Sequence, residues 1–237
     1  MMPVMPTPLL AVATAASATL AIVSAPWALG QPWMNLLFKP LTTLLVMAHA
    51  WPRGRATPQA RRWVLAGLGM SLAGDVALLW SDRGFLAGLV CFLWAHLAYL
   101  RGFTRGGVRF GARRLPLVGY AVLAALVLWW LWPGVPGALR LPVLAYVAAL
   151  AAMAAQAAVW ALRASGTPRQ GAGRMLALGG ALFLASDALL ATNRFAAPLP
   201  LASLWILTSY WLAQWCIASW LEPPPGASAR QGAGVRA

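Results

Sequence analysis

The chain alternates between long apolar runs and short polar segments along most of its length. Eight runs approach the roughly 20 residues that a helix needs to cross a bilayer. They cover residues 9–29, 33–51, 63–80, 85–101, 115–132, 141–162, 174–192 and 199–221. None shows the alternation of apolar and polar positions that marks a membrane β-barrel strand. The pattern therefore predicts an all-α, polytopic membrane protein with eight transmembrane helices.

The composition excludes soluble proteins and disordered chains. Of the 237 residues, 61% are hydrophobic and 9% are charged, whereas soluble domains carry about 25% charged residues. Such a chain has too little polar surface to cover a soluble core, and it is too hydrophobic to stay disordered. We expect residues 1–222 to form one transmembrane domain and the Pro- and Gly-rich residues 223–237 to form a disordered cytoplasmic tail.

The positions of the basic residues predict the orientation of the helices. A net charge of +14 would suggest nucleic-acid binding in a soluble protein, but here the arginines lie between apolar runs, so no nucleic-acid partner is expected. One set of alternate segments carries most of them: Arg53, Arg55, Arg61, Arg62, Arg101, Arg105, Arg109, Arg113, Arg114, Arg163, Arg169, Arg174, Arg230 and Arg236. The other set carries only Arg83, Arg140 and Arg194. Since positive loops stay in the cytoplasm, both termini are predicted to be cytoplasmic, and the Ala- and Arg-rich composition points to a bacterial inner membrane.

A weak internal repeat links two of the apolar runs. Residues 67–79 (GLGMSLAGDVALL) resemble residues 179–191 (GGALFLASDALLA), which aligns Asp75 with Asp187. The offset pairs the third run with the seventh, and these two runs have the same predicted orientation. A parallel duplication of a four-helix unit is expected, and repeats of this kind commonly place a functional site at their junction.

Three charged residues lie inside the apolar runs: Lys39, Asp75 and Asp187. An ionised carboxylate near the bilayer centre costs at least about 2.5–3.5 kcal/mol, so each acid should be paired, protonated or in a wet cavity. Counting along the helices places all three at a similar depth. We expect the two acids to share one hydrated cavity, where one carboxyl can be protonated and the other ionised. The alternative is that Lys39 only neutralises one acid or extends to the interface.

Four other polar residues in these runs are candidate cavity residues. His96 and Tyr99 share one face of their helix, as do Tyr210 and Gln214. Each could instead hydrogen-bond a neighbouring helix, which is a common role of such residues in membranes. The two histidines and the two cysteines stand apart in the sequence, so neither a metal site nor a cofactor is expected.

Several short motifs, in this order and spacing, resemble the YhhN family. They are Lys39-Pro40-Leu41, Ala73-Gly74-Asp75, Phe85 to Leu89 with Ala95-His96 and Tyr99, Tyr146 and Met153, Ser186-Asp187 with Phe195, and Tyr210 with Ala213-Gln214. The resemblance covers about residues 35–220. It implies an eight-helix protein, and the members with a known activity are lysoplasmalogenases.

The resemblance implies hydrolysis of the vinyl ether of a lysoplasmalogen, which releases a fatty aldehyde and glycerophospho-ethanolamine or -choline. With that chemistry, Asp75 and Asp187 are expected to be the catalytic acid and base. The expected substrate-binding residues are Lys39, His96, Tyr99, Tyr210 and Gln214. The implied partners are the lysophospholipid substrate and membrane lipids; no cofactor is needed, and the oligomeric state is open.

Two other classes of function remain as alternatives. A non-enzymatic lipid-binding protein or proton-coupled carrier would also contain intramembrane acids. A carrier should interrupt matching helices in both halves, but Pro40 has no counterpart in residues 141–162. A membrane scaffold would leave the two buried acids without a purpose.

Overall fold

A computed structural model of the chain describes residues 7–224, with the backbone alone at 81–83. Within this range the secondary structure is entirely helical, as predicted. The α-helices are α1 (Thr7–Val23), α2 (Pro32–Ala50), α3 (Pro58–Ala77), α4 (Ser81–Arg105), α5 (Arg114–Leu131), α6 (Arg140–Ala164), α7 (Gln170–Phe195) and α8 (Ala202–Trp220). Two short 3₁₀ turns, Trp132–Gly134 and Gly137–Leu139, join α5 to α6. The predicted tail from residue 225 onward lies outside the described residues.

Four of these helices are long and apolar enough to cross a membrane: the segments Gly84–Arg105, Arg114–Gly134, Gly137–Ala164 and Gln170–Phe195. They correspond to α4, α5, α6 and α7. The shorter α1 is also apolar. Lys39 in α2, Asp75 in α3 and Gln214 in α8 are all buried inside the bundle. Polar side chains of this kind lower the hydropathy of a helix without facing its surroundings. The fold is that of an integral membrane protein.

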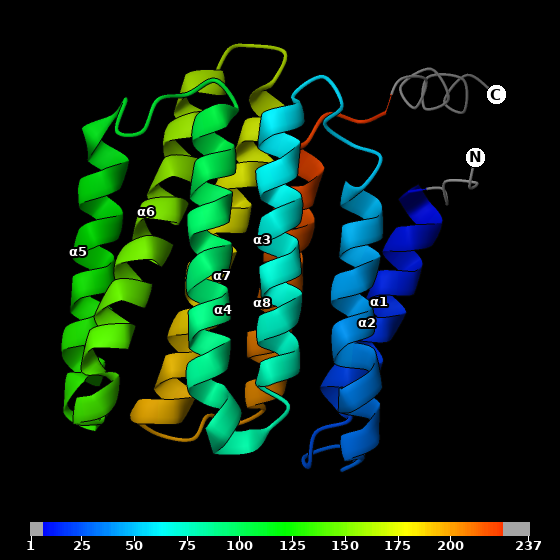
Figure 1. Cartoon of the computed structure of the whole chain (residues 1–237), viewed down its shortest axis with the longest axis vertical. Helices are drawn as coiled ribbons and strands as arrows, with labels where there is room; N and C mark the ends of the chain where they lie inside the picture. Colours follow the sequence, from blue (N-terminus) through cyan, green and yellow to red (C-terminus); the bar gives the residue numbers. More distant parts are fainter. Residues whose placement is uncertain (1–6, 225–237) are drawn as a thin grey trace.

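The helices run side by side in one bundle (Figure 1). The pairs α3–α4 and α7–α8 form the centre, with α1–α2 at one side and α5–α6 at the other. Helix α2 contacts both α3 and α8, and helix α6 contacts both α7 and α4. Consecutive helices are antiparallel, so α1 begins and α8 ends at the same end of the bundle (Figure 1).

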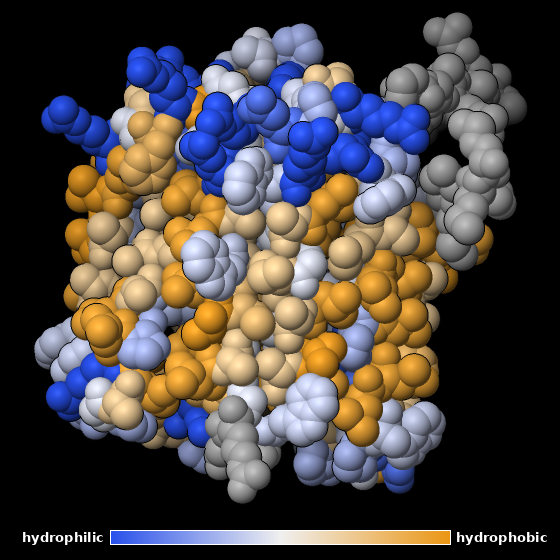
Figure 2. Space-filling model, in the orientation of Figure 1, coloured by the Kyte–Doolittle hydropathy of each residue, from blue (hydrophilic) through white to orange (hydrophobic). Residues whose placement is uncertain are grey.

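The surface of the bundle is apolar around its middle and strongly hydrophilic at one end (Figure 2). Large side chains on the flank are fully accessible, for example Leu115 at 81% and Trp129 at 77% of their maximum exposure. An exposed apolar belt of this extent is unfavourable in water and favourable in lipid. The hydrophilic end is where α1 begins, and it holds the arginine-rich loops.

Close helix contacts in the centre depend on small residues. A side chain at Gly67 would collide with the ring of Tyr99 on α4, and one at Gly74 would lie 2.6 Å from the ring of Phe92. In the other half, a Cβ at Gly179 would lie 3.0 Å from the carbonyl oxygen of Ala213 on α8. Small residues allow this approach in membrane helices, where dispersion contacts take the place of the hydrophobic effect.

Three helices extend at least three residues beyond the apolar runs seen in the sequence. Helix α3 begins at Pro58, α4 continues to Arg105 and α7 continues to Phe195. A helix does not need to end where hydrophobicity ends, because long arginine side chains at its ends can reach water. The extension of α7 places Arg194 on the helix and not in a loop.

Candidate active site

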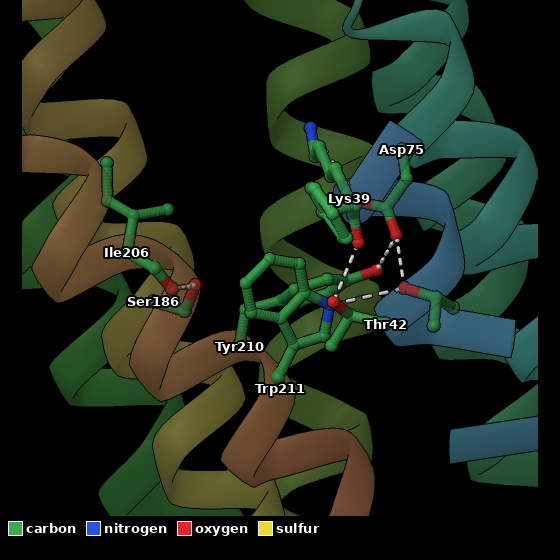
Figure 3. Close-up of polar contacts among 9 residues, drawn as sticks. Lys39, Thr42, Asp75, Ser186, Ile206, Tyr210 and Trp211 are labelled. Atoms are coloured by element: carbon green, nitrogen blue, oxygen red, sulfur yellow. Dashed lines mark hydrogen bonds and ion pairs between the residues drawn. The ribbon is translucent and has the colours of Figure 1, made fainter. Parts of the chain in front are cut away.

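Asp75 lies in a closed polar cluster at the centre of the bundle, and only 1% of its surface is exposed. Its Oδ2 accepts hydrogen bonds from Thr43 Oγ1 at 2.6 Å and from the Tyr210 hydroxyl at 2.8 Å. Trp211 Nε1 extends the cluster by donating to Thr43 Oγ1 at 3.2 Å. Figure 3 shows Tyr210 and Trp211 beside Asp75. The carboxylate thus joins α2, α3 and α8.

Lys39 is the positive partner in this cluster. Its Nζ lies 3.8 Å from Asp75 Oδ1, and the lysine is buried like the acid. Burying a charge without a partner would cost several kcal/mol, so each group requires the other. The geometry thus agrees with the alternative from the sequence in which Lys39 neutralises one aspartate. Figure 3 shows the lysine next to Asp75.

Asp187 forms a second cluster with side chains from α4 and α6. The Tyr146 hydroxyl donates a hydrogen bond to its Oδ2 at 2.7 Å. His96 Nε2 lies 3.3 Å from the same carboxylate oxygen and 3.0 Å from the Tyr146 hydroxyl. His96 is completely buried, and within residues 7–224 its Nδ1 has no hydrogen-bond partner. A proton on the histidine is therefore better placed on Nε2, where an acceptor is present.

The Asp187 cluster opens into an apolar cavity between α4, α5, α6 and α7. The cavity has a volume of about 80 Å³ and is partly open, so it can hold a short stretch of a hydrocarbon chain whose remainder would lie outside it. Tyr146 and Asp187 supply the polar groups, and the remaining lining is apolar, with Phe85, Leu128 and Val143 as examples. An acid in the wall of an apolar cavity is suited to an apolar ligand that carries one polar group.

The two aspartates do not meet in one cavity, which corrects the expectation from the sequence. The lining of the cavity includes Asp187 but not Asp75. The ring of Phe183 packs edge-on against both His96, at 4.8 Å between centroids, and Tyr210, at 5.5 Å. Aromatic packing thus lies between the two clusters. Estimates of depth along separate helices could not show this, because they ignore what fills the space between the helices.

Two further predicted site residues, Tyr99 and Gln214, are buried outside the cavity. Tyr99 is fully buried, and its hydroxyl is 3.4 Å from Ser71 Oγ, while its ring stacks on Phe103 at 6.3 Å. Gln214 is also fully buried, and neither of its side-chain polar atoms has a partner within the described residues. Neither residue lines the cavity described above.

Sequence reasoning gave no site role to the two closest hydroxyl partners of the acids, Thr43 and Tyr146, although Tyr146 stands in one of the family motifs. Thr43 lies one turn after Lys39 on the same face of α2, a signal that helical spacing could have supplied. Tyr146 is one of two polar side chains in the interior of the Ala-rich α6, the other being Gln156. A tyrosine in a helix interior usually has a partner for its hydroxyl. Ser186 is a different case, because its hydroxyl donates to the Ile206 carbonyl and joins α7 to α8 (Figure 3).

Metal binding was not expected from the sequence. In residues 7–224, no three His, Cys, Asp or Glu side chains lie close enough together to hold a metal ion. Cys91 and Cys216 are free thiols on different helices.

The known proteins to which this chain is similar include several lysoplasmalogenases. The chain is 32% identical to lysoplasmalogenase TMEM86A of Homo sapiens over 191 residues, which cover 78% of this chain and 77% of that protein. It is 33% identical to lysoplasmalogenase TMEM86B of Sus scrofa over 198 residues, 82% of this chain and 79% of that protein. It is 30% identical to a lysoplasmalogenase of Mycobacterium bovis over 174 residues, 70% of this chain and 62% of that protein.

No solved structure matches the chain. The model of the YhhN family matches residues 34–221. This range begins within α2 and ends just after α8, so it contains Lys39, both aspartates and the cavity between α4 and α7. The resemblance seen in the sequence is confirmed: the chain belongs to the YhhN family.

Proposed function

We propose that this protein is a membrane-embedded lysoplasmalogenase, which hydrolyses the vinyl ether of a single-chain alkenyl glycerophospholipid. The names of its relatives support the substrate class. The observation that carries the proposal is the position of Asp187, hydrogen-bonded to Tyr146 and next to His96, in the wall of an apolar cavity. The first part of the alkenyl chain would occupy the cavity, with its vinyl ether at Asp187.

The reaction needs one well-placed proton donor. A proton adds to the β carbon of the vinyl ether, and the electron pair of the double bond forms the new C–H bond. The result is an oxocarbenium ion, which water captures to give a hemiacetal. The hemiacetal then breaks its bond to the glycerol oxygen, and that oxygen takes up a proton. The products are a fatty aldehyde and a glycerophospho-alcohol, and no oxidant or reductant is consumed.

Asp187 is suited to both the protonation step and the hydration step of this reaction. As a carboxylic acid it donates the first proton, and as a carboxylate it then stabilises the adjacent oxocarbenium ion and accepts a proton from the attacking water. Glycosidases meet a similar cation with carboxyl groups. General acid–base catalysis of this kind contributes about 10²–10⁴ in rate. His96 at 3.3 Å can exchange a proton with Asp187, and Tyr146 holds the carboxyl in place.

In this proposal Asp75 supports the site from behind. Its carboxylate is already engaged by Thr43, Tyr210 and Lys39. The Tyr210 ring in turn packs edge-on against Phe92, which lines the cavity, at 5.8 Å. A scheme in which Asp75 serves as the second catalytic carboxyl would need a proton path around these rings. The two schemes give different results with the Asp75→Asn variant.

The same proposal includes eight transmembrane helices with cytoplasmic termini. Lys39, Asp75 and Gln214 are buried inside the bundle, so they do not interrupt the apolar surfaces of α2, α3 and α8. The arginine-rich loops lie at the end where α1 begins, as expected for a cytoplasmic face, and that end is strongly hydrophilic (Figure 2). The cavity lies toward the opposite end, because its lining includes Leu78, Leu131 and Phe195 at the ends of α3, α5 and α7. The lipid head group would then lie on the non-cytoplasmic side.

A duplicated four-helix unit accounts for the symmetry of the two clusters. Asp75 on α3 is bonded from α2 and α8, and Asp187 on α7 is bonded or contacted from α6 and α4. With α1–α4 equated to α5–α8, each acid takes one partner from the preceding helix and one from the last helix of the other half. One copy would have become a closed ion pair and the other an open site.

An assay of aldehyde release tests the function. The purified protein is given lysoplasmenyl-ethanolamine in D₂O, and the aldehyde is trapped by reduction as it forms. Protonation of the β carbon predicts one deuterium at C2 of the product. A saturated alkyl ether of the same head group should give no product, since it has no double bond to protonate. Absence of aldehyde release, or aldehyde without deuterium at C2, would reject the proposal, and proton-coupled lipid flux without product would favour the carrier.

A further inference from the structure

We propose that the hydrocarbon chain of the substrate reaches Asp187 sideways from the bilayer, through an opening between α4 and α5. This inference rests on the proposed function and names the route by which a single-chain lipid enters the site. The occupant of the opening is the chain of that lipid, which stays in apolar surroundings while its vinyl ether meets the acid.

Helices α4 and α5 both line the cavity but do not pack along one another. Phe85 and Leu89 of α4 are lining residues, as are Val127 and Leu128 of α5. Within the described part of the chain, α5 packs mainly on α6, with a smaller contact to α7, and α4 packs on α3 and α6. Helix α5 stands at the outer edge of the bundle (Figure 1). The side of the cavity between α4 and α5 is therefore the side that no helix pair closes.

The exposure of the lining side chains agrees with an opening on this side. Val143, Tyr146 and Leu150 of α6 are buried, so α6 forms a closed wall. Leu89 of α4 and Leu128 of α5 line the cavity and are only half-buried. Side chains of this kind stand where a cavity meets its surroundings.

The end of the cavity near the last turn of α7 is closed by Phe195. Its ring packs edge-on against Phe85, at 5.8 Å between centroids, and this contact joins α7 to α4. A side chain at Gly134 would collide with the carbonyl oxygen of Phe195, so the turn after α5 also packs on α7. Entry from this end of the bundle would have to displace both contacts, whereas entry between α4 and α5 separates no packed pair of helices.

The size of the cavity requires that most of the chain lies outside it. A volume of about 80 Å³ holds only a short stretch of hydrocarbon. The neighbours of the lining residues are exposed and apolar: Leu86 and Val90 on α4, and Leu126 and Trp129 on α5. Contact of a hydrocarbon chain with water is unfavourable, and contact with lipid is not. A chain that leaves the cavity between these two apolar flanks passes directly into the bilayer.

Photo-crosslinking locates the chain of a bound lipid. The probe is a saturated 1-O-alkyl glycerophosphoethanolamine with a diazirine in the middle of its chain, which has no double bond to protonate. The wild type is irradiated with the probe in lipid nanodiscs, and the labelled residues are identified by mass spectrometry. Adducts that an excess of the unlabelled analogue removes should fall on residues 85–90 of α4 and 123–131 of α5. Competed adducts on other helices only, or adducts that the analogue does not reduce, would overturn the proposal.

Substitution at the opening gives a second measurement. Leu128→Trp adds bulk to a lining residue, and Leu126→Trp adds the same bulk at an exposed position of α5 outside the lining. Leu128→Trp should raise KM for long-chain lysoplasmenyl-ethanolamine about 10- to 100-fold, as expected for an overpacked contact. KM for the 1-O-propenyl analogue, whose chain ends inside the cavity, should change little, which also shows that the variant is folded. Leu126→Trp should behave like the wild type with both substrates.

The outcomes separate this proposal from the proposed function. Equal losses of Leu128→Trp for the long and the short substrate, or unchanged KM for both, would overturn the opening. If Leu128→Trp does not fold, the adducts in the wild type decide. Competed adducts on α4 and α5 without aldehyde release would leave the opening and reject the hydrolysis. Aldehyde release with competed adducts elsewhere would leave the hydrolysis and reject the opening.

Discussion

The Tyr146 hydroxyl donates a 2.7 Å hydrogen bond to Oδ2 of Asp187, and both side chains line the apolar cavity. This contact fixes the acid at the boundary between polar and apolar surroundings. The same tyrosine hydroxyl is 3.0 Å from His96 Nε2, so one group orients both the acid and its neighbour.

Removal of that hydroxyl should slow the reaction without weakening substrate binding. Tyr146→Phe leaves the ring in the cavity but releases the Asp187 carboxyl, so we expect kcat to fall about 10- to 100-fold with little change in KM. Tyr120→Phe on α5 is the matched control, since Tyr120 lies outside this cavity. A rise in KM without a fall in kcat, or no change in either constant, would show that Tyr146 serves only in packing.

The Lys39–Asp75 pair should be more important for stability than for chemistry. Asp75→Asn leaves the buried Lys39 ammonium without its anion, a loss of about 3–5 kcal/mol in the free energy of unfolding. The double variant Lys39→Met/Asp75→Asn should recover much of this loss, because it leaves no unpaired charge. Thermal unfolding in detergent measures both. A double variant as unstable as Asp75→Asn would mean that hydrogen bonds, and not the unpaired charge, cause the loss.

Close packing at Gly74 is expected to shape the cavity. A Cβ at Gly74 would lie 2.6 Å from the Phe92 ring, and Phe92 lines the cavity. Gly74→Ala should therefore displace that ring, destabilise the protein by about 1–3 kcal/mol and raise KM. Gly69→Ala on the same helix is the control, since a Cβ there meets nothing within 4 Å. Equal unfolding temperatures and equal KM values for the two variants would contradict this packing argument.

Labelling of single cysteines can check the proposed orientation. In a background without Cys91 and Cys216, cysteine replaces Arg105 at the end of α4 or Arg140 at the start of α6. A membrane-impermeant maleimide added to intact cells should label Arg140→Cys and leave Arg105→Cys unlabelled until the cells are opened. Labelling in the reverse order would invert the topology, and labelling of both from one side would exclude the predicted number of crossings.

The hydrophobic pattern was enough to place all eight helices, because apolar runs separated by arginine-rich loops leave few alternatives. It also selected Asp75, Asp187 and Lys39, since charged residues inside apolar runs are costly unless they are paired or used. The pattern could not separate the two acids, because the separation depends on the packing of Phe183 between neighbouring helices. The pattern also ended the seventh run at residue 192 and so placed Arg194 in a loop, whereas α7 continues to Phe195. A hydropathy average does not detect a last helical turn that is polar because it reaches water.

The central claim is that Asp187, the acid at the cavity, protonates the vinyl ether. The most direct measurement compares the rate of aldehyde release by the wild type, Asp187→Asn and Asp75→Asn at saturating lysoplasmenyl-ethanolamine. We predict that Asp187→Asn loses at least about 10²-fold in kcat, the lower range for general acid catalysis, while it still binds the saturated ether analogue. Folded Asp75→Asn should retain far more activity. Near-normal turnover by Asp187→Asn would contradict the account.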